Sequence, residues 1–463
     1  MKKLFLSSLL ITLSQFVFSQ HQSDKWYFGI HAGLDFTSGS PVPIADGALS
    51  TSEGCSSISD FTGNLILYTD GRTVYDRDNQ PMPNGTGLDG GESSTQAALI
   101  VPLPGSSQYY YIFTTDQIGG PLGFRYSVVD MTLNNGFGDV TTKNELIQNH
   151  VTEKVVAELT RTGTDYWVIA HDWGSNSFYA YKLTSAGLDL TPVISSTGTV
   201  HNTSVIQNTY GQMKFSTCGE KLACAISYQD TVQIFDFDRE TGEVSNPVSL
   251  PFYDHVYGLE FSPDGNLLYV TTNYDSYALW QFDLTSGNAD SIQASAEAIS
   301  TLDGLNGLQL GPDHKIYVAR AWNGYLGIIN DPDVPGVNCN FDETGIYLDP
   351  NYQNITSSLG LPEFMQSFFQ DESSCIATGI HEVPQNENSV YPNPSPEAFT
   401  LSLSSFHHPK EITIYNMQGE IAEWYTAFPE NDNFSFGGNL PAGMYSVLLK
   451  NDDGVKSMLV VKM

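Results

Sequence analysis

Short apolar runs, parted by turns that contain glycine or proline, recur along the chain between about residues 25 and 370. In the clearest unit, residues 256–261 are followed by Ser262-Pro263-Asp264-Gly265-Asn266 and then by the apolar run 267–272. Pro-Asp-Gly fits a tight turn, because proline presets the first φ angle and glycine tolerates a positive one. This pattern predicts pairs of antiparallel β-strands.

The same unit of strand, turn, strand, loop and third strand repeats with a period of roughly 43 to 58 residues, a range typical of propellers and solenoids. The corresponding turns fall at Thr62-Gly63-Asn64, Pro104-Gly105, Thr162-Gly163, Cys218-Gly219 and Gly311-Pro312-Asp313. Together with the turn at Asp264 they define about six units. The repeats therefore predict an all-β fold with a β-propeller.

A seventh blade is predicted from the two ends of this region. Residues 25–28 and 34–36 resemble a second and a third strand without a first one, and 361–369 resembles a strand without a continuation. One blade built from both ends would remove the exposed sheet edges of an open array. We expect about seven blades, with six or eight as alternatives.

The first residues have the features of a secretory signal peptide. Lys2 and Lys3 precede an apolar run at 4–13, and Val17-Phe18-Ser19 offers a cleavage site. No other apolar run is long enough to predict a transmembrane helix. We expect a signal peptide at 1–19, the propeller at 20–370, a polar linker at 371–388 and a C-terminal domain at 389–463.

The last seventy or so residues predict a small Ig-like β-sandwich, because alternating strands are parted by Gly and Pro turns. Three motifs follow in order: Tyr391-Pro392-Asn393-Pro394, then 412–419 ending in Gly419, then 440–445 with Gly443 and Tyr445. A short basic and apolar end contains Lys462.

This order of motifs resembles the type A C-terminal sorting domain of the type IX secretion system. The resemblance implies recognition by the secretion machinery, cleavage, and export across the outer membrane of a Bacteroidetes-type bacterium. It also implies a protein that is secreted or attached to the outer cell surface, with a surface glycolipid as a partner. The sorting signal would comprise Tyr391, Pro392, Asn393, Pro394, Gly419, Gly443, Tyr445 and Lys462.

The propeller region resembles a second family through Trp26-Tyr27-Phe28-Gly29, Glu53-Gly54-Cys55, Tyr68-Thr69-Asp70-Gly71 and related motifs. These are similar to the N-terminal propellers of large secreted Bacteroidetes proteins of the gliding-motility-associated type. The resemblance implies no activity, so it identifies no catalytic residue.

The charge balance disfavours one class of partner. The chain has 52 acidic and 19 basic residues, a formal charge of -33, so phosphate-rich nucleic acid would be repelled and cations attracted. Five cysteines in an exported protein allow two disulfides. Cys218 with Cys224, and Cys339 with Cys375, are the candidate pairs, which would leave Cys55 free.

Aligned repeats place one loop per blade between the second and third strands, and these loops should ring one mouth of the central channel. Carboxylates there could bind calcium, a cationic group or a glycan, with aromatic side chains stacking on sugar rings. Turn chemistry is the alternative, because Asp side chains bond their own backbone in loops. The candidate ligand-binding residues are Asp70, Asp116, Asp172, Trp173, Asp230, Asp275 and Trp322.

The motifs of two large enzyme classes are missing from the sequence. It contains no G-x-S-x-G nucleophile elbow and no H-E-x-x-H zinc motif. We therefore predict a non-enzymatic binding or adhesion module with a glycan or protein ligand. Two alternatives remain open: a carbohydrate-active enzyme with carboxylates in the propeller mouth, and a structural component of the gliding or surface layer.

Overall fold

The computed structural model describes residues 21–252, 254–273, 277–351 and 353–370, and in the C-terminal part residues 390–391, 395–402, 411–416, 421–426, 433–450 and 455–462. The chain divides into two compact units, Met1–Cys375 and Ile376–Met463. The predicted signal peptide and linker lie outside the described residues.

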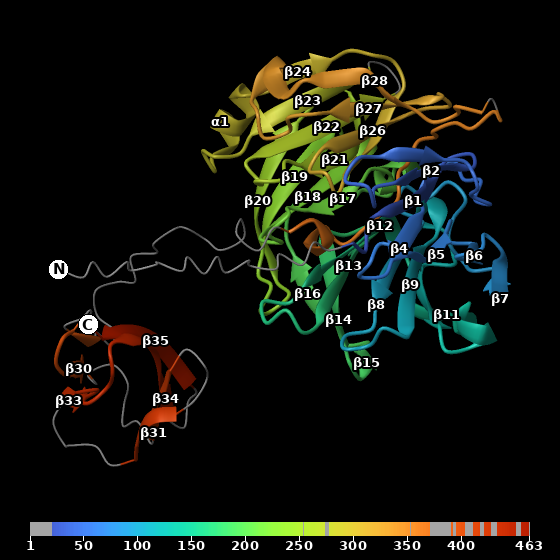
Figure 1. Ribbon diagram of the computed structural model, residues 1–463. Helices are drawn as coiled ribbons and strands as arrows, with labels where there is room; N and C mark the ends of the chain where they lie inside the picture. Colours follow the sequence, from blue (N-terminus) through green and yellow to red (C-terminus); the bar gives the residue numbers. More distant parts are fainter. Residues whose placement is uncertain are drawn as a thin grey trace, which may run out of the picture. The chain divides into compact units, whose positions relative to one another are not determined.

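The first unit contains seven antiparallel sheets arranged as blades around a common axis, with the blue first blade beside the orange last one (Figure 1). The first three blades are β1 (Lys25–Phe28), β2 (Ala32–Asp35) and β3 (Val42–Ile44); β4 (Ser56–Ser59), β5 (Leu65–Thr69), β6 (Thr73–Asp76) and β7 (Pro81–Thr86); and β8 (Ala98–Pro102), β9 (Tyr109–Thr115), β10 (Phe124–Asp130) and β11 (Asp139–Gln148).

The fourth and fifth blades are β12 (Val151–Leu159), β13 (Tyr166–Asp172), β14 (Ser177–Thr184), β15 (Gly187–Leu188) and β16 (Val193–Ser196); and β17 (Met213–Phe215), β18 (Lys221–Ile226), β19 (Thr231–Phe237) and β20 (Val244–Pro251). The sixth and seventh are β21 (His255–Phe261), β22 (Leu267–Asn273), β23 (Ala278–Asp283) and β24 (Glu297–Ser300); and β25 (Leu305–Leu310), β26 (Ile316–Arg320), β27 (Tyr325–Ile329) and β28 (Phe341–Tyr347).

The helices of this unit are short. They are α1 (Ala289–Ala294) and the 3-10 turns η1 (Gln117–Gly119), η2 (Asn134–Gly136), η3 (Ile206–Thr209), η4 (Ser227–Gln229), η5 (Gly336–Cys339) and η6 (Gln366–Phe369). The predicted all-β fold with a seven-bladed propeller is therefore confirmed.

The predicted turn at Asp264 shows how local sequence sets the strand pairs. The Asp264 carboxylate accepts hydrogen bonds from Ser262 Oγ (2.6 Å) and from the backbone N–H of Asn266 (3.0 Å). Gly265 follows at φ +72°, which a side chain would make costly. The turn thereby fixes the register between β21 and β22.

The apolar runs of the strands are explained by burial on both faces of each blade. In β18, Leu222 and Cys224 pack with residues of the fourth blade, whereas Ala223 and Ala225 pack with residues of the sixth. Because successive side chains of a strand point to opposite faces, a strand between two neighbours must be apolar throughout.

The ring closes where the two ends of the propeller meet. Ile30 and Thr356 form an antiparallel bridge, and Gly307 N–H donates to the Leu359 carbonyl. The strand predicted at 361–369 is not formed. Pro362 makes one parallel bridge to Cys55, and η6 follows. The segment lacks a ladder because its side chains fill the channel instead, as described below.

The structure corrects both predicted disulfides. Cys55, Cys224 and Cys339 are buried free thiols, so neither the pair Cys218–Cys224 nor the pair Cys339–Cys375 is formed. Cys218 is disulfide-bonded. Cys375 lies outside the described residues. Burial raises the pKa of the Cys55 and Cys339 thiols, and that of Cys224 to about 11, so these thiols are unreactive at neutral pH.

The second unit contains two facing sheets around one core, as predicted for the sandwich. The sheets are β29 (Val390–Tyr391), β30 (Phe399–Ser402) and β33 (Asn433–Phe436); and β32 (Ile421–Tyr425), β31 (Glu411–Asn416), β34 (Gly443–Lys450) and β35 (Val455–Lys462), each in spatial order. Its core includes Phe399, Ile412, Ile414 and Val447.

The predicted sorting-signal residues that the structure describes lie in these strands. Tyr391 is in β29, Gly443 begins β34, and the buried Tyr445 donates its hydroxyl to the Pro441 carbonyl (2.9 Å). Lys462 bridges to Ser395 and its Nζ donates to the Glu397 carbonyl. Pro392, Asn393, Pro394 and Gly419 lie outside the described residues.

We expect the segment 361–370 to be essential for the propeller fold. A chain that ends after Cys375 should keep a cooperative thermal transition and resist protease, whereas one that ends after Gly360 should lose both, because Phe364, Met365 and Phe368 would leave the core. Near-ultraviolet circular dichroism and limited proteolysis would report the difference. A Cys218→Ser variant of the longer chain measures separately what the disulfide of Cys218 contributes, and a folded shorter chain would contradict the prediction.

Candidate functional site

The predicted ligand-binding residues lie in the connections between the second and third strands of successive blades. Asp70 lies between β5 and β6, Asp116 between β9 and β10, Asp172 at the end of β13, and Asp230 between β18 and β19. Trp173 follows Asp172, and Trp322 lies between β26 and β27. Asp275 lies outside the described residues.

Three of these aspartates bind their own loops. Asp70 accepts from the backbone N–H groups of Arg72 (2.9 Å) and Thr73 (2.8 Å). Asp116 accepts from the backbone N–H groups of Gln117 and Leu122, both at 2.9 Å. Asp172 accepts from Ser175 Oγ (2.7 Å) and Gln148 Nε2 (3.1 Å). These hydrogen bonds stabilise the loops, which is the role that turn chemistry, the alternative to ligand binding, predicts for these aspartates.

The other predicted residues that the structure describes have contacts of their own. Asp230 has a φ of +50°, and its Oδ1 lies 2.8 Å from His255 Nδ1. The Trp173 ring packs on Gly119, where an added Cβ would come within 1.9 Å of the ring. Trp322 is 56% exposed. Among the described residues, His, Cys, Asp and Glu form no group of three or more that could hold a metal ion. The calcium prediction therefore has no ligand set in this part of the chain.

A different set of polar residues gathers where the first strands of the blades begin. Glu53 accepts from Ser93 Oγ (2.8 Å) and from the Tyr257 hydroxyl (3.2 Å). Glu153 accepts from the backbone N–H and the hydroxyl of Thr95, both at 2.9 Å, and from Ile118 N–H (2.6 Å). Because β12 begins beside Asp172, this cluster lies at the loop end of the channel, here called the mouth.

The two mouth carboxyl groups differ in their electrostatics. Burial raises the pKa of Glu53 to about 8, with a further rise from the nearby Glu153 charge, so Glu53 holds a proton at neutral pH. Burial also raises the pKa of Glu153, and the donors on Thr95 and Ile118 oppose that rise. A carboxylic acid beside a carboxyl group that accepts several hydrogen bonds is an arrangement that can support acid–base chemistry.

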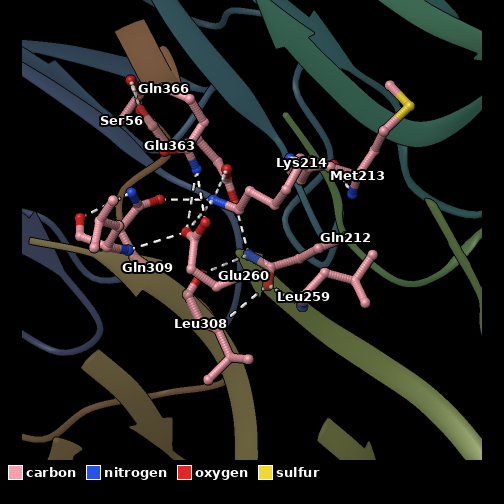
Figure 2. A network of polar contacts seen from close by, with 12 residues as sticks. Ser56, Gln212, Met213, Lys214, Leu259, Glu260, Leu308, Gln309, Glu363 and Gln366 are labelled. Carbon is pink, nitrogen blue, oxygen red and sulfur yellow. Dashed lines mark hydrogen bonds and ion pairs between the residues drawn. The ribbon is translucent and has the colours of Figure 1, made fainter. Parts of the chain in front are cut away.

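Below the mouth, the segment 361–370 fills the channel with a buried polar network, and the side chains converge on Lys214 (Figure 2). Lys214 Nζ lies 2.7 Å from Glu363 Oε2, 2.6 Å from Gln309 Oε1 and 4.0 Å from Glu260 Oε2. Gln366 donates to Glu260 (2.9 Å), whose pKa burial raises to about 7. All five side chains are at most 2% exposed.

The far end of the channel has a third carboxyl group. Glu158 accepts from Gln370 Nε2 (3.3 Å) and from the backbone of Ser367, and burial raises its pKa to about 8. Glu158 pairs with Trp167 near the turn end of β12, away from Asp172. The segment 361–370 therefore runs through the channel from the mouth to the opposite end.

One buried cluster lies off the axis, between the fourth and fifth blades. The rings of His171 and His201 stack with centroids 3.7 Å apart, and His201 Nε2 lies 4.0 Å from Cys224 Sγ. Burial lowers the pKa of His171 to about 3 and that of Lys154 to about 8. Neutral rings and a protonated thiol offer no activated nucleophile.

The sequence contained a signal for the channel residues that loop alignment alone missed. Glu158, Lys214, Glu260 and Gln309 each precede the last apolar residue of the first strand in their repeats. A polar residue at one fixed position in apolar strands marks the side that faces the axis. Glu53 and Glu153 carry no comparable repeat signal.

A cavity of about 270 Å³ opens between the fifth and sixth blades. Its lining residues are Pro251, Phe252, Asp254, Thr272, Trp280, Phe282, Gln293 and Ala296. The rings of Phe252 and Phe282 meet edge to face at 5.4 Å. The lining extends from Pro251, which pairs with Thr231 next to Asp230, to Phe282, which pairs with Leu268 near the β21–β22 turn. Apolar walls with a few polar groups are typical of ligand sites.

Fold and motifs thus define an exported propeller with a C-terminal targeting domain. Residues 389–462 match the family model of the secretion system C-terminal sorting domain. This domain indicates export by the type IX secretion system, interaction with its machinery, and a place outside the cell or on its surface. Within the described residues, no helix is long and apolar enough to cross a membrane.

The comparison with curated proteins gives no match to this chain. Among solved structures, the chain is similar to a candidate 6-phosphogluconolactonase from Bacteroides uniformis, with 12% identity, a TM-score of 0.45, and coverage of 73% of this chain and 98% of that one. The Cps50 propeller domain from Myceliophteria thermophila has 9% identity, a TM-score of 0.39 and coverage of 65% and 94%. Likenesses this distant carry no information about activity.

We expect Lys214→Met to lower the free energy of unfolding of the propeller by about 3–5 kcal/mol, because it leaves Glu363 buried without its partner. Guanidinium unfolding followed by tryptophan fluorescence would measure this loss. Lys221→Met is the matched control, since the Lys221–Asp236 pair is 50% and 43% exposed and should contribute less than about 1 kcal/mol. Adding Glu363→Met to Lys214→Met should restore most of the loss. Equal losses for Lys214→Met and Lys221→Met would refute the role of the buried pair.

The raised pKa of Glu53 predicts a pH dependence of stability. In the unfolded chain this carboxyl group loses its proton near pH 4.3, but in the folded protein only near pH 8, so folding binds a proton in between. This contribution to stability is complete below about pH 4 and is lost as the pH rises through 8. Glu53→Gln should therefore flatten the decline in unfolding midpoint between pH 5.5 and 8.5. Parallel curves for both proteins would count against a protonated Glu53.

Proposed function

We propose that the propeller is a non-enzymatic binding module at the cell surface, for adhesion or for capture of a polymer, with a glycan as its ligand. The observation that carries this proposal is the cavity between the fifth and sixth blades. Trp280 and Phe252 are partly exposed and offer ring faces for the C–H face of a sugar, while Asp254 and Gln293 offer polar groups at its hydroxyls.

The filled channel supports ligand binding rather than catalysis on the propeller axis. The chain's own segment 361–370 fills it, and the carboxylates there bind Lys214, Gln366 and Gln370. A ligand must therefore bind at the rim or between blades. The type IX sorting domain supports the location of such a module outside the cell.

Trp280→Ala should weaken glycan binding by roughly tenfold or more, because aromatic residues at the centre of a site contribute most of its affinity. A glycan array probed with the full mature protein, with and without calcium, would find the ligand, and titration calorimetry would give the loss. Trp322→Ala is the matched control, as Trp322 is an exposed tryptophan of the seventh blade. If Trp322→Ala abolished binding and Trp280→Ala did not, the ligand would bind at the predicted loop ring and the cavity would be excluded.

A carbohydrate-active enzyme is the second candidate, favoured by the mouth pair. Glu53 holds a proton near neutral pH and lies close enough to Glu153 for the charge of one to shift the pKa of the other. Glycoside hydrolysis uses such a pair, one group as acid and the other as base or nucleophile. Incubation of the bound glycan with the protein separates the two functions, since turnover that Glu53→Gln abolishes without loss of binding would establish the enzyme.

A structural role in the gliding or surface layer is the remaining prediction, and it depends on the resemblance of the propeller to gliding-motility-associated proteins. Absence of any glycan hit, combined with abundance of the protein in the outer-surface fraction, would favour it over the binding module.

A further inference from the structure

The strand β32 of the second unit carries a β-bulge that changes which side chains share a face. It pairs with β31 through Ile412↔Tyr425, Thr413↔Trp424, Ile414↔Glu423 and Tyr415↔Ile421, with a register shift between Ile414 and Tyr415. In a regular strand, residues 421 and 424 would point to opposite faces. The extra residue Ala422 places Ile421 and Trp424 on one face, beside Tyr415 and Thr413.

This face is the outer one. Ile412 and Ile414 point the other way, into the core, where Tyr425 packs as well. Ile421 is 61% exposed and Trp424 58%, and they are the large exposed hydrophobic side chains of the described part of this unit. Tyr415 is partly buried opposite Ile421, and Leu448 faces Thr413 from β34. These residues form one apolar strip, here called the β31–β32 face.

The strip is ordered and has a polar rim. Trp424 Nε1 donates to Glu411 Oε1 (3.0 Å), which also accepts from the Thr413 hydroxyl (3.1 Å). On the opposite face of β32, Glu423 accepts from the Tyr425 hydroxyl (2.8 Å) and from Gly437 N–H (2.8 Å), which fixes the strand from the inner side. A fixed tryptophan with apolar neighbours and a polar rim has the composition of a protein-binding hot spot.

The strip also lies at the edge of its sheet. The described residues give β32 a single strand partner, β31, on one side. Most proteins avoid exposed apolar residues on an edge strand, because such a strand can associate with another protein. Where these residues are present, they mark a site of protein association. The family match indicates the kind of partner, because residues 389–462 match a secretion system C-terminal sorting domain.

We propose that the β31–β32 face, with Trp424 and Ile421 at its centre, is the surface through which the sorting domain docks onto a protein of the export machinery. The partner presents an apolar surface that covers Trp424, Ile421 and Tyr415. This inference depends on the export route and is independent of the ligand proposed for the propeller. Removal of the apolar strip would leave the propeller folded and its glycan binding intact.

The test uses the full chain in a host that exports it, with fractionation into medium, surface and periplasm. The Trp424→Ala/Ile421→Ser double variant should lower the exported fraction roughly tenfold, because large side chains at a hot spot contribute most of the docking energy. The chain should then collect in the periplasm in a protease-resistant form. Trp424→Phe/Ile421→Leu keeps the apolar strip and should be exported normally.

Two controls make the outcome decisive. Phe61→Ala/Leu190→Ala removes two exposed hydrophobic residues from the propeller, 78% and 55% exposed, and should leave export unchanged. If the double variant fails to fold, Ile421→Lys takes its place. It adds a charge at an exposed position without removing a core residue, so the exported fraction of this variant then tests the proposal. Normal export of a folded double variant, or of Ile421→Lys, overturns the proposal. A dimer-to-monomer change in sedimentation with normal export would assign the face to a second copy and also overturn it.

Discussion

The ion pair between Lys214 and Glu363 joins the first strand of the fifth blade to the segment that closes the ring. Both groups are almost completely withdrawn from water, and an isolated charge there would cost several kcal/mol. Such a pair adds little net stability over an apolar one. The pair does favour the closed ring over a propeller that lacks this segment, because Lys214 would then be buried without its carboxylate partner.

This constraint explains where a ligand can bind. In an open propeller, the polar residues that face the axis would line a water-filled channel. Here Lys214, Glu260 and Gln309 are bound to one another and to residues 363–366, so the axis is a polar core. Spaces of ligand size must lie at the rim or between blades, as the cavity beside Trp280 does. The acidic composition contributes a long-range field around the protein.

The fold was predictable because turn chemistry is local. Asp264 and Gly265 form the turn that their order predicts, and the repeat of this signal gave the blades and the loops that carry Asp70, Asp116 and Asp172. The irregular segment 361–370 was not predictable as such, since its apolar residues fit a strand as well as a channel filling. The predicted disulfide pairs failed because spacing in sequence does not fix where a side chain points: Cys224 lies close to Cys218 along the chain, but it packs into the core with residues of the fourth blade. Glu53 and Glu153 approach across three blades, and no single repeat contains both.

The closing segment also connects the two ends of the channel. It begins near the bridge between Ile30 and Thr356 and ends where Gln370 contacts Glu158, at the turn end of the blades. The loops that carry Asp70, Asp116 and Asp172 lie at the opposite end. Passing this segment through the channel therefore closes the ring and, in the same step, gives the buried polar side chains of the first strands their hydrogen-bond partners along the axis.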